Sequence, residues 1–199
     1  MFKLGFVLGR FQMLHLDHEN MIRKALSVCD RVLLMVGSST ESGTVRNPFN
    51  LYTRMDLIRR VFNSEIVNGK LLICHTDDMT HEEDHSYEWG DFLLDKIEMW
   101  KSHYALIDDV DCFIYGNDEE RDSWFDPEKI KGVSHLVIAR NDRSATNIRL
   151  LMSNNKYEAW SSHVPKKISS RATFYNLRRE LLEIEWYKRV HSGEVNSNV

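Results

Sequence analysis

Hydrophobic positions along the chain follow two alternating patterns. Five short runs are rich in apolar, β-branched or aromatic residues, as buried strands are: Leu4–Leu8, Arg31–Val36, Leu71–Cys74, Val110–Tyr115 and Ser134–Ala139. Other segments place apolar residues three and four positions apart, as amphipathic helices do: Glu19–Val28, Tyr52–Phe62, Glu88–Trp100, Ile148–Met152 and Ala172–Val190. Strands that alternate with helices predict parallel βαβ units. We therefore expect an α/β fold, a doubly wound parallel sheet of about five strands with a C-terminal helix.

Composition indicates one globular domain. The chain has 199 residues, of which 42% are hydrophobic and 28% are charged. Three prolines and nine glycines leave no room for a long flexible linker. We expect a single domain over residues 1–191 and a disordered tail over residues 192–199.

The net charge and the cysteines indicate which kinds of binding partner and which cellular compartment to expect. A net charge of -4 offers no basic excess to neutralise nucleic-acid phosphates, so we expect no nucleic-acid partner. No window approaches about 18 uninterrupted apolar residues, the length of a membrane span, and the apolar N-terminus is too short for a signal peptide. Three scattered cysteines, Cys29, Cys74 and Cys112, are typical of thiols in a reducing compartment. We expect a cytoplasmic protein without a membrane partner.

Polar residues and glycines follow the predicted strands, where parallel sheets bind their ligands. They are Gly9–Gln12 with His15 and His18, then Gly37–Ser39, Asp77–Asp78, Gly116–Asn117 and Arg140. Two common phosphate loops are absent from the sequence, Gly-x-Gly-x-x-Gly after the first strand and Gly-x-x-x-x-Gly-Lys-Ser/Thr anywhere. Their absence argues against NAD redox chemistry and against a kinase-type loop.

His15 and His18 stand where the first helix is expected to begin. Free N–H groups and the positive end of the helix dipole favour a phosphate there, and two imidazoles three residues apart can share one side of the first turn. The plainer interpretation is that His15 caps a loop and His18 is a surface residue of the helix. The two histidines alone leave both interpretations open.

A second segment, Arg143–Arg149, follows the last predicted strand. Its small hydroxyl residues suit a helix start, and Arg149 projects from the first turns. Alone it indicates a serine cap and a surface arginine. Together with His15 and His18 it places two imidazoles, a guanidinium and a second helix N-terminus at one sheet edge, which predicts a triphosphate clamp.

These two segments resemble motifs of the nucleotidylyltransferase superfamily. His15–His18 is similar to its His-x-Gly-His motif, and Ser144–Arg149 to its Ser/Thr-rich-x-Ile-Arg motif. Three further segments are most similar to nicotinamide-nucleotide adenylyltransferases of the small archaeal type: Gly9–Gln12, Gly37–Phe49 and Tyr115–Asn117. The resemblance implies a Rossmann-like sheet and an enzyme that transfers the adenylyl group of ATP to nicotinamide mononucleotide, giving NAD and pyrophosphate in NAD biosynthesis or salvage. It also implies Mg²⁺ bound with ATP.

The resemblance also implies roles for individual residues. The phosphate-contacting catalytic group would be His15, His18, Arg149 and Arg10. Further ATP-binding residues would be Gly9, Phe11, Ser144 and Thr146. The acceptor would contact Arg46, Trp89 and Asn117, with the nicotinamide ring stacked on Trp89. Without the resemblance, Trp89 is equally a core residue of its helix. We expect no residue of the chain to be a dedicated metal ligand.

Asp17 stands where the superfamily motif has glycine. A carboxylate about 4 Å from a phosphate charge is repelled by about 4 kcal/mol at an effective dielectric constant of 20. We expect Asp17 to avoid this by capping a helix that begins at His18, accepting from the backbone of Glu19 or Asn20. The alternative is that it helps hold the Mg²⁺ of ATP.

Several alternatives stay open from the sequence. A different phosphorylated acceptor, CTP in place of ATP, or a non-catalytic nucleotide sensor would also use the clamp, and nicotinamide is not distinguished from its nicotinate analogue. His81–His85 matches His-Glu-x-x-His, but its polar surroundings favour a solvated loop over a zinc site. The acidic run Asp118–Asp122 also reads as a solvated loop. Ala172–Val190 suits packing on its own domain or a subunit seam, so a homo-oligomer is possible.

Overall fold

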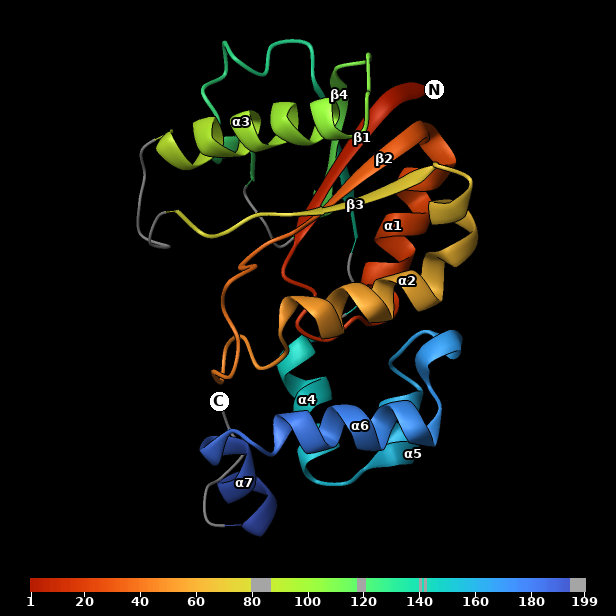
Figure 1. Ribbon diagram of the computed structural model, residues 1–199, viewed down its shortest axis with the longest axis vertical. Helices are drawn as coiled ribbons and strands as arrows, with labels where there is room; N and C mark the ends of the chain where they lie inside the picture. Colours follow the sequence, from red (N-terminus) through yellow and green to blue (C-terminus); the bar gives the residue numbers. More distant parts are fainter. Residues whose placement is uncertain (80–86, 118–120, 140, 142, 194–199) are drawn as a thin grey trace. The chain divides into compact units, whose positions relative to one another are not determined.

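The computed structural model describes residues 1–79, 87–117, 121–139, 141 and 143–193 (Figure 1). Its contacts divide the chain into two compact units, and each unit is built from three separate stretches. The first, here called the sheet unit, comprises Met1–Gly9, Met21–Ser39 and Ser64–Arg140. The second, here called the helical unit, comprises Arg10–Asn20, Thr40–Asn63 and Asn141–Val199.

The sheet unit contains one parallel sheet of five strands, ordered β3-β2-β1-β4-β5. The strands are β1 (Phe2–Gly9), β2 (Cys29–Val36), β3 (Leu71–His75), β4 (Val110–Gly116) and β5 (Ser134–Ile138). Each one overlaps the apolar run that predicted it. The order reverses beside β1, which is the switch point where doubly wound sheets bind their ligands. The predicted α/β fold is therefore confirmed.

Helices cover both faces of this sheet. Figure 1 shows α3 (Glu88–His103) on one side and α1 (Leu16–Val28) on the other. Alternate β1 residues, Leu4, Phe6 and Leu8, share an apolar cluster with Leu93 and Ile97 of α3. This alternation follows from the two-residue period of a strand.

The helical unit contains most of the remaining helices. They are α2 (Leu51–Val67, whose last residues belong to the sheet unit), α4 (Ala145–Ser153), α5 (Tyr157–Ser161), α6 (Arg171–Leu181) and α7 (Glu185–Ser192). The described residues also form two 3-10 turns, η1 (Arg121–Trp124) in the sheet unit and η2 (Lys166–Ile168) in the helical unit. Of the helices in the described residues, none is long and apolar enough to cross a membrane.

The prediction of one continuous helix over Ala172–Val190 is wrong. The chain forms α6 and α7, separated at Ile184, whose backbone is extended. Leu181 and Val190 are both buried, but nine residues of straight helix would set them about 180° apart around the axis. The break allows both to be buried. Gly193 ends α7 at a φ of 79°, and the rest of the predicted tail, residues 194–199, lies outside the described residues.

Candidate functional site

Two histidine rings meet at the start of α1, in the helical unit. His15 is fully buried and directly precedes the helix, where its carbonyl accepts a hydrogen bond from the Glu19 N–H at 3.0 Å. The ring centroids of His15 and His18 are 3.7 Å apart, and the Phe11 ring meets His18 edge-on at 5.0 Å. His18 is half-buried, so one part of its ring is packed and another is accessible.

The turn that leads to these histidines is held by a buried arginine. Phe11 is buried at a φ of 50°, a left-handed conformation that non-glycine residues rarely adopt. Arg54 of α2 is fully buried and donates to the Arg10 carbonyl at 2.9 Å and to the Asn50 carbonyl at 3.3 Å. These bonds tie the backbone at the start of the turn to the beginning of α2, while the Arg10 side chain is exposed.

Arg149 lies inside the helical unit with only 4% of its surface exposed. Its Nη1 donates to the Gln12 carbonyl at 3.1 Å, its Nη2 to the Thr146 hydroxyl at 3.1 Å, and its Nε to the Tyr187 hydroxyl at 2.7 Å. Ser144 caps α4, accepting from the Asn147 N–H at 3.5 Å. The predicted serine cap is confirmed, whereas the alternative of a surface arginine is wrong.

The surroundings of Arg149 leave part of its binding capacity for an anion. A guanidinium has five N–H donors, and the three bonds to protein groups leave one donor at Nη1 and one at Nη2. No carboxylate in the described part of the chain pairs with it, although a buried charge without a counter-ion is costly. An anion held by two parallel N–H groups, as a phosphate can be, would supply that counter-charge.

Asp17 contradicts the expectation that it caps the helix. Because α1 begins at Leu16, Asp17 lies within the first turn rather than before it, and the Glu19 N–H is already bonded to His15. The buried Asp17 carboxylate accepts instead from Arg143 Nη1 at 2.7 Å and from Asn141 Nδ2 at 3.4 Å. The positive charge of Arg143 therefore offsets the negative charge of Asp17 beside the histidines.

Arg46 belongs to a loop of the helical unit that is tied to the segment after β1. Gln12 and Phe49 are bonded twice: Gln12 Nε2 donates to the Phe49 carbonyl at 3.2 Å, and the Phe49 N–H donates to Gln12 Oε1 at 2.9 Å. Both residues are buried, while Arg46 is exposed. The loop therefore has a fixed base and a solvent-facing arginine.

The other predicted acceptor residues belong to the sheet unit. Trp89 of α3 is half-buried and packs on the apolar cluster, with its ring centroid 5.7 Å from Phe92 and 6.3 Å from Trp124. Asn117 is exposed after β4, and its N–H donates to the Ile138 carbonyl at 3.1 Å. Both interpretations of Trp89 fit this position, because one part of the ring is packed and another is exposed.

Several sequence features fall outside the candidate site. His81–His85, Asp118–Glu120 and Arg140 lie outside the described residues. In the described part of the chain, His, Cys, Asp and Glu form no group of three that could hold a metal ion. The three cysteines are buried, and burial raises the pKa of the Cys29 thiol to about 12 and of Cys112 to about 11.

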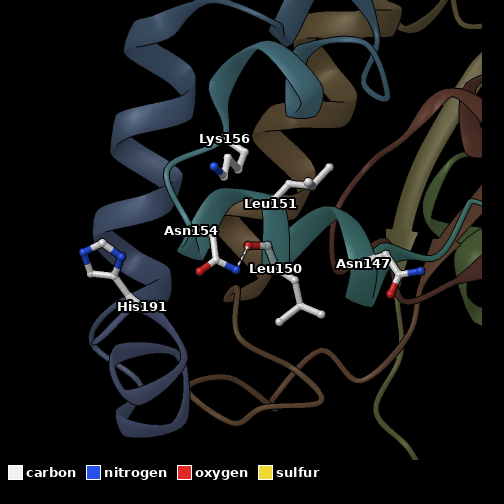
Figure 2. A pocket seen from close by; sticks show the side chains of 6 residues that line it. All are labelled: Asn147, Leu150, Leu151, Asn154, Lys156 and His191. Carbon is white, nitrogen blue, oxygen red and sulfur yellow. Dashed lines mark hydrogen bonds between the residues drawn. The ribbon is translucent and has the colours of Figure 1, made fainter. Parts of the chain in front are cut away.

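An open pocket of about 610 Å³ lies along α4 in the helical unit (Figure 2). Its lining comprises Asn147, Leu150, Leu151, Asn154, Lys156 and His191. Figure 2 shows Asn154 bonded to the Leu150 carbonyl, at 3.1 Å, and His191 on the neighbouring helix. None of the predicted site residues lines this pocket.

Sequence reasoning missed two residues of the arrangement, Arg54 and Tyr187. In the sequence each is one more residue of an amphipathic helix. Their significance comes from their partners, which lie 44 and 38 residues away along the chain. A buried arginine or tyrosine can be recognised only once the elements that cover it are known.

Comparison with known proteins shows which family the chain resembles. The model of the family described as cytidylyltransferase-like matches residues 6–172. A nicotinamide-nucleotide adenylyltransferase from Thermoplasma acidophilum is 25% identical over 166 residues, which cover 83% of each chain. The enzyme of the same name from Saccharolobus solfataricus is 47% identical over 55 residues, covering 28% of this chain and 32% of that one.

A solved structure is similar in fold. It is a bifunctional NMN adenylyltransferase/ADP ribose pyrophosphatase from Francisella tularensis, complexed with AMP and a manganese ion, with a TM-score of 0.63 and 18% identity. The similarity covers 98% of this chain and 53% of the other, so this chain spans about half the length of that bifunctional protein.

Proposed function

The chain belongs to the cytidylyltransferase-like family, and from that premise we propose that it transfers the adenylyl group of ATP to nicotinamide mononucleotide, forming NAD and pyrophosphate. The observation that carries the proposal is the buried Arg149, which lacks a carboxylate partner in the described chain and shares the helical unit with the His15–His18 pair. The nicotinamide-nucleotide adenylyltransferases that resemble this chain over most of their length support the choice of acceptor.

The reaction needs positioning and charge stabilisation rather than a base. A phosphate oxygen of the acceptor attacks the α-phosphorus of ATP, the bond from that phosphorus to the bridging oxygen breaks, and pyrophosphate leaves with the electron pair. The phosphate monoester is already ionised at neutral pH, so no proton has to be removed from it. Catalysis then depends on donors held where negative charge develops.

We assign the phosphate contacts to the helical unit. The two remaining N–H donors of Arg149 would bind the β- and γ-phosphates, and N–H groups of His15 and His18 would donate to phosphoryl oxygens. Arg10, at the exposed side of the turn, would add a further cationic contact. The other proposed ATP contacts are the backbone at Gly9 and Phe11 and the α4 N-terminus at Ser144 and Thr146.

We assign the acceptor to Arg46, Trp89 and Asn117. The exposed Arg46 would bind the phosphate of nicotinamide mononucleotide. The accessible part of the Trp89 ring would stack on the pyridinium, a cation–π contact. The side-chain amide of the exposed Asn117 supplies both a donor and an acceptor for the carboxamide of the ring.

The divalent metal fits as a companion of ATP rather than as a resident ion. Asp17, the acidic residue between the two histidines in the sequence, has one carboxylate oxygen engaged by Arg143, and we propose that ATP itself supplies the phosphate ligands of Mg²⁺. When bound there, Mg²⁺ would neutralise charge on the phosphoryl oxygens. We also propose a cytoplasmic location, which the three buried, unpaired thiols support.

A substrate panel tests the proposal. Purified protein with Mg²⁺ is incubated with ATP or CTP and with nicotinamide mononucleotide, nicotinate mononucleotide or another phosphorylated acceptor, and pyrophosphate release and products are followed. We expect NAD from ATP and nicotinamide mononucleotide, a kcat lower by about 100- to 1000-fold in Arg149→Ala, and normal turnover in Arg171→Ala, which removes an exposed arginine paired with Glu158. Turnover only with CTP or another acceptor would refute the substrate assignment, and nucleotide binding without any turnover would indicate a sensor.

A further inference from the structure

Tyr187 of α7 contacts the functional arginine from outside the part of the chain that matches the family, residues 6–172. The side chain is fully buried. Its hydroxyl accepts from Arg149 Nε at 2.7 Å and donates to the Val45 carbonyl at 3.2 Å. The Tyr187 carbonyl accepts from the Ser153 hydroxyl of α4 at 2.9 Å, so the backbone of α7 is fixed to the same helix that carries Arg149.

The directions of these hydrogen bonds show that the Tyr187 hydroxyl links two other groups. A phenol has a single proton, and a guanidinium can only donate. Arg149 donates to the oxygen of the Tyr187 hydroxyl, so the proton of that hydroxyl is directed to the carbonyl of Val45, the residue before Arg46. One oxygen atom therefore joins the arginine of the α4 motif to the loop that carries the exposed Arg46.

We propose that Tyr187 is a positioning residue for phosphate transfer, an inference that rests on the proposed function. The Nε–H···O bond sets the plane of the Arg149 guanidinium, and the bonds to Gln12 and Thr146 set its ends. The two remaining N–H groups are then aimed as a fixed pair. Without the hydroxyl, only the bonds to Gln12 and Thr146 restrain the guanidinium, which can then tilt about its Cδ–Nε bond and lose its alignment with the phosphate in the transition state.

The principal test is the kinetics of Tyr187→Phe, which keeps the ring and removes the hydroxyl. Misplacement of a positioned group can cost about a hundredfold in rate, so we expect kcat to fall by at least about tenfold, with a smaller rise in the KM for ATP. The matched control is Tyr157→Phe, which removes a part-buried hydroxyl that donates to the Ser169 carbonyl at 2.9 Å and has no bond to Arg149. The control loses a comparable bond and should keep its kcat.

A double-mutant cycle separates positioning from general stabilisation. If Tyr187 acts through Arg149, Tyr187→Phe in an Arg149→Ala background lowers kcat no further. An independent, multiplicative loss in the double variant would overturn the inference, as would a normal kcat in Tyr187→Phe alone. Should Tyr187→Phe fail to fold, Ser153→Ala loosens the backbone anchor of Tyr187 instead and is measured in the same cycle.

The two proposals can fail separately. If the wild-type protein forms no NAD under any condition of the panel, the proposed function fails, and the cycle is repeated on the binding of α,β-methylene-ATP measured by calorimetry. The inference then predicts that Tyr187→Phe weakens binding in the wild-type background and not in the Arg149→Ala background. Equal losses in both backgrounds would refute it, whatever the reaction.

Discussion

Arg143→Ala tests how the chain tolerates an aspartate where the superfamily motif has glycine. The Asp17 side chain keeps only 4% of its surface exposed, and its partner Arg143 keeps 29%. Removing the arginine leaves a buried carboxylate beside His15 and His18, with the Asn141 amide as its one remaining hydrogen-bond donor among the described residues. We therefore expect the substitution to lower both stability and the affinity for ATP.

The geometry of the pair gives the magnitude. Two unit charges whose centres are about 4 Å apart attract by about 4 kcal/mol at an effective dielectric constant of 20. Exposed ion pairs contribute about 0 to 1 kcal/mol, and breaking a fully buried pair costs about 3 to 5 kcal/mol. With one buried and one partly exposed partner, we expect Arg143→Ala to cost about 2 kcal/mol, which corresponds to a fall in Tm of roughly 4 to 8 °C for a domain of this size.

This prediction is tested by measuring the thermal and urea unfolding of four proteins. They are the wild type, Arg143→Ala, Asp17→Asn/Arg143→Ala and, as a control for an exposed ion pair, Arg171→Ala. The double variant should recover much of the lost stability, because the uncompensated charge is gone, and it should also recover the KM for ATP. A Tm for Arg143→Ala equal to that of the control would show that the buried pair contributes nothing. No recovery in the double variant would show that the loss does not come from the Asp17 charge.

Three further predictions concern activity and packing. His18→Ala and Arg149→Ala should each lower kcat by about 100- to 1000-fold through lost transition-state donors, with melting measured in parallel; near-normal kcat in both would refute their catalytic role. Trp89→Ala should weaken acceptor binding by about 2 kcal/mol while ATP binding measured by calorimetry is unchanged; equal losses for the two substrates would make it a core residue. Gly90→Ala should destabilise the sheet unit by about 1 to 3 kcal/mol, because its Cβ would lie 2.1 Å from the Trp124 carbonyl oxygen; wild-type melting would contradict this.

Local signals in the sequence were sufficient for the sheet and for part of the site. Each strand overlaps a short run rich in apolar residues, and Ser144 caps α4 as its residue type predicts. The pairing of Asp17 with Arg143 was not predictable, because the two residues are 126 positions apart in the sequence. No residue near Asp17 in the sequence favours this ion pair over a helix cap. The contact between the buried Arg149 and Tyr187 was also not predictable. It depends on the break at Ile184 between α6 and α7, which allows apolar residues on opposite sides of one predicted helix to be buried.

The division of the helical unit into three distant stretches has a consequence for synthesis of the chain. Gln12 and Arg149 are 137 residues apart, and Val45 and Tyr187 are 142 apart, so the contacts around the arginine close very long loops. The sheet unit is complete in sequence at Arg140, whereas the helical unit still lacks α4 and α7 at that point. At a ribosomal rate of about 5 to 20 residues per second, α4 and α7 are synthesised on the order of ten seconds or more after the segment that contains His15. A growing chain therefore has its sheet residues available for folding well before it can assemble the arginine network, and a ribosome stalled before α7 would hold a chain that lacks Tyr187.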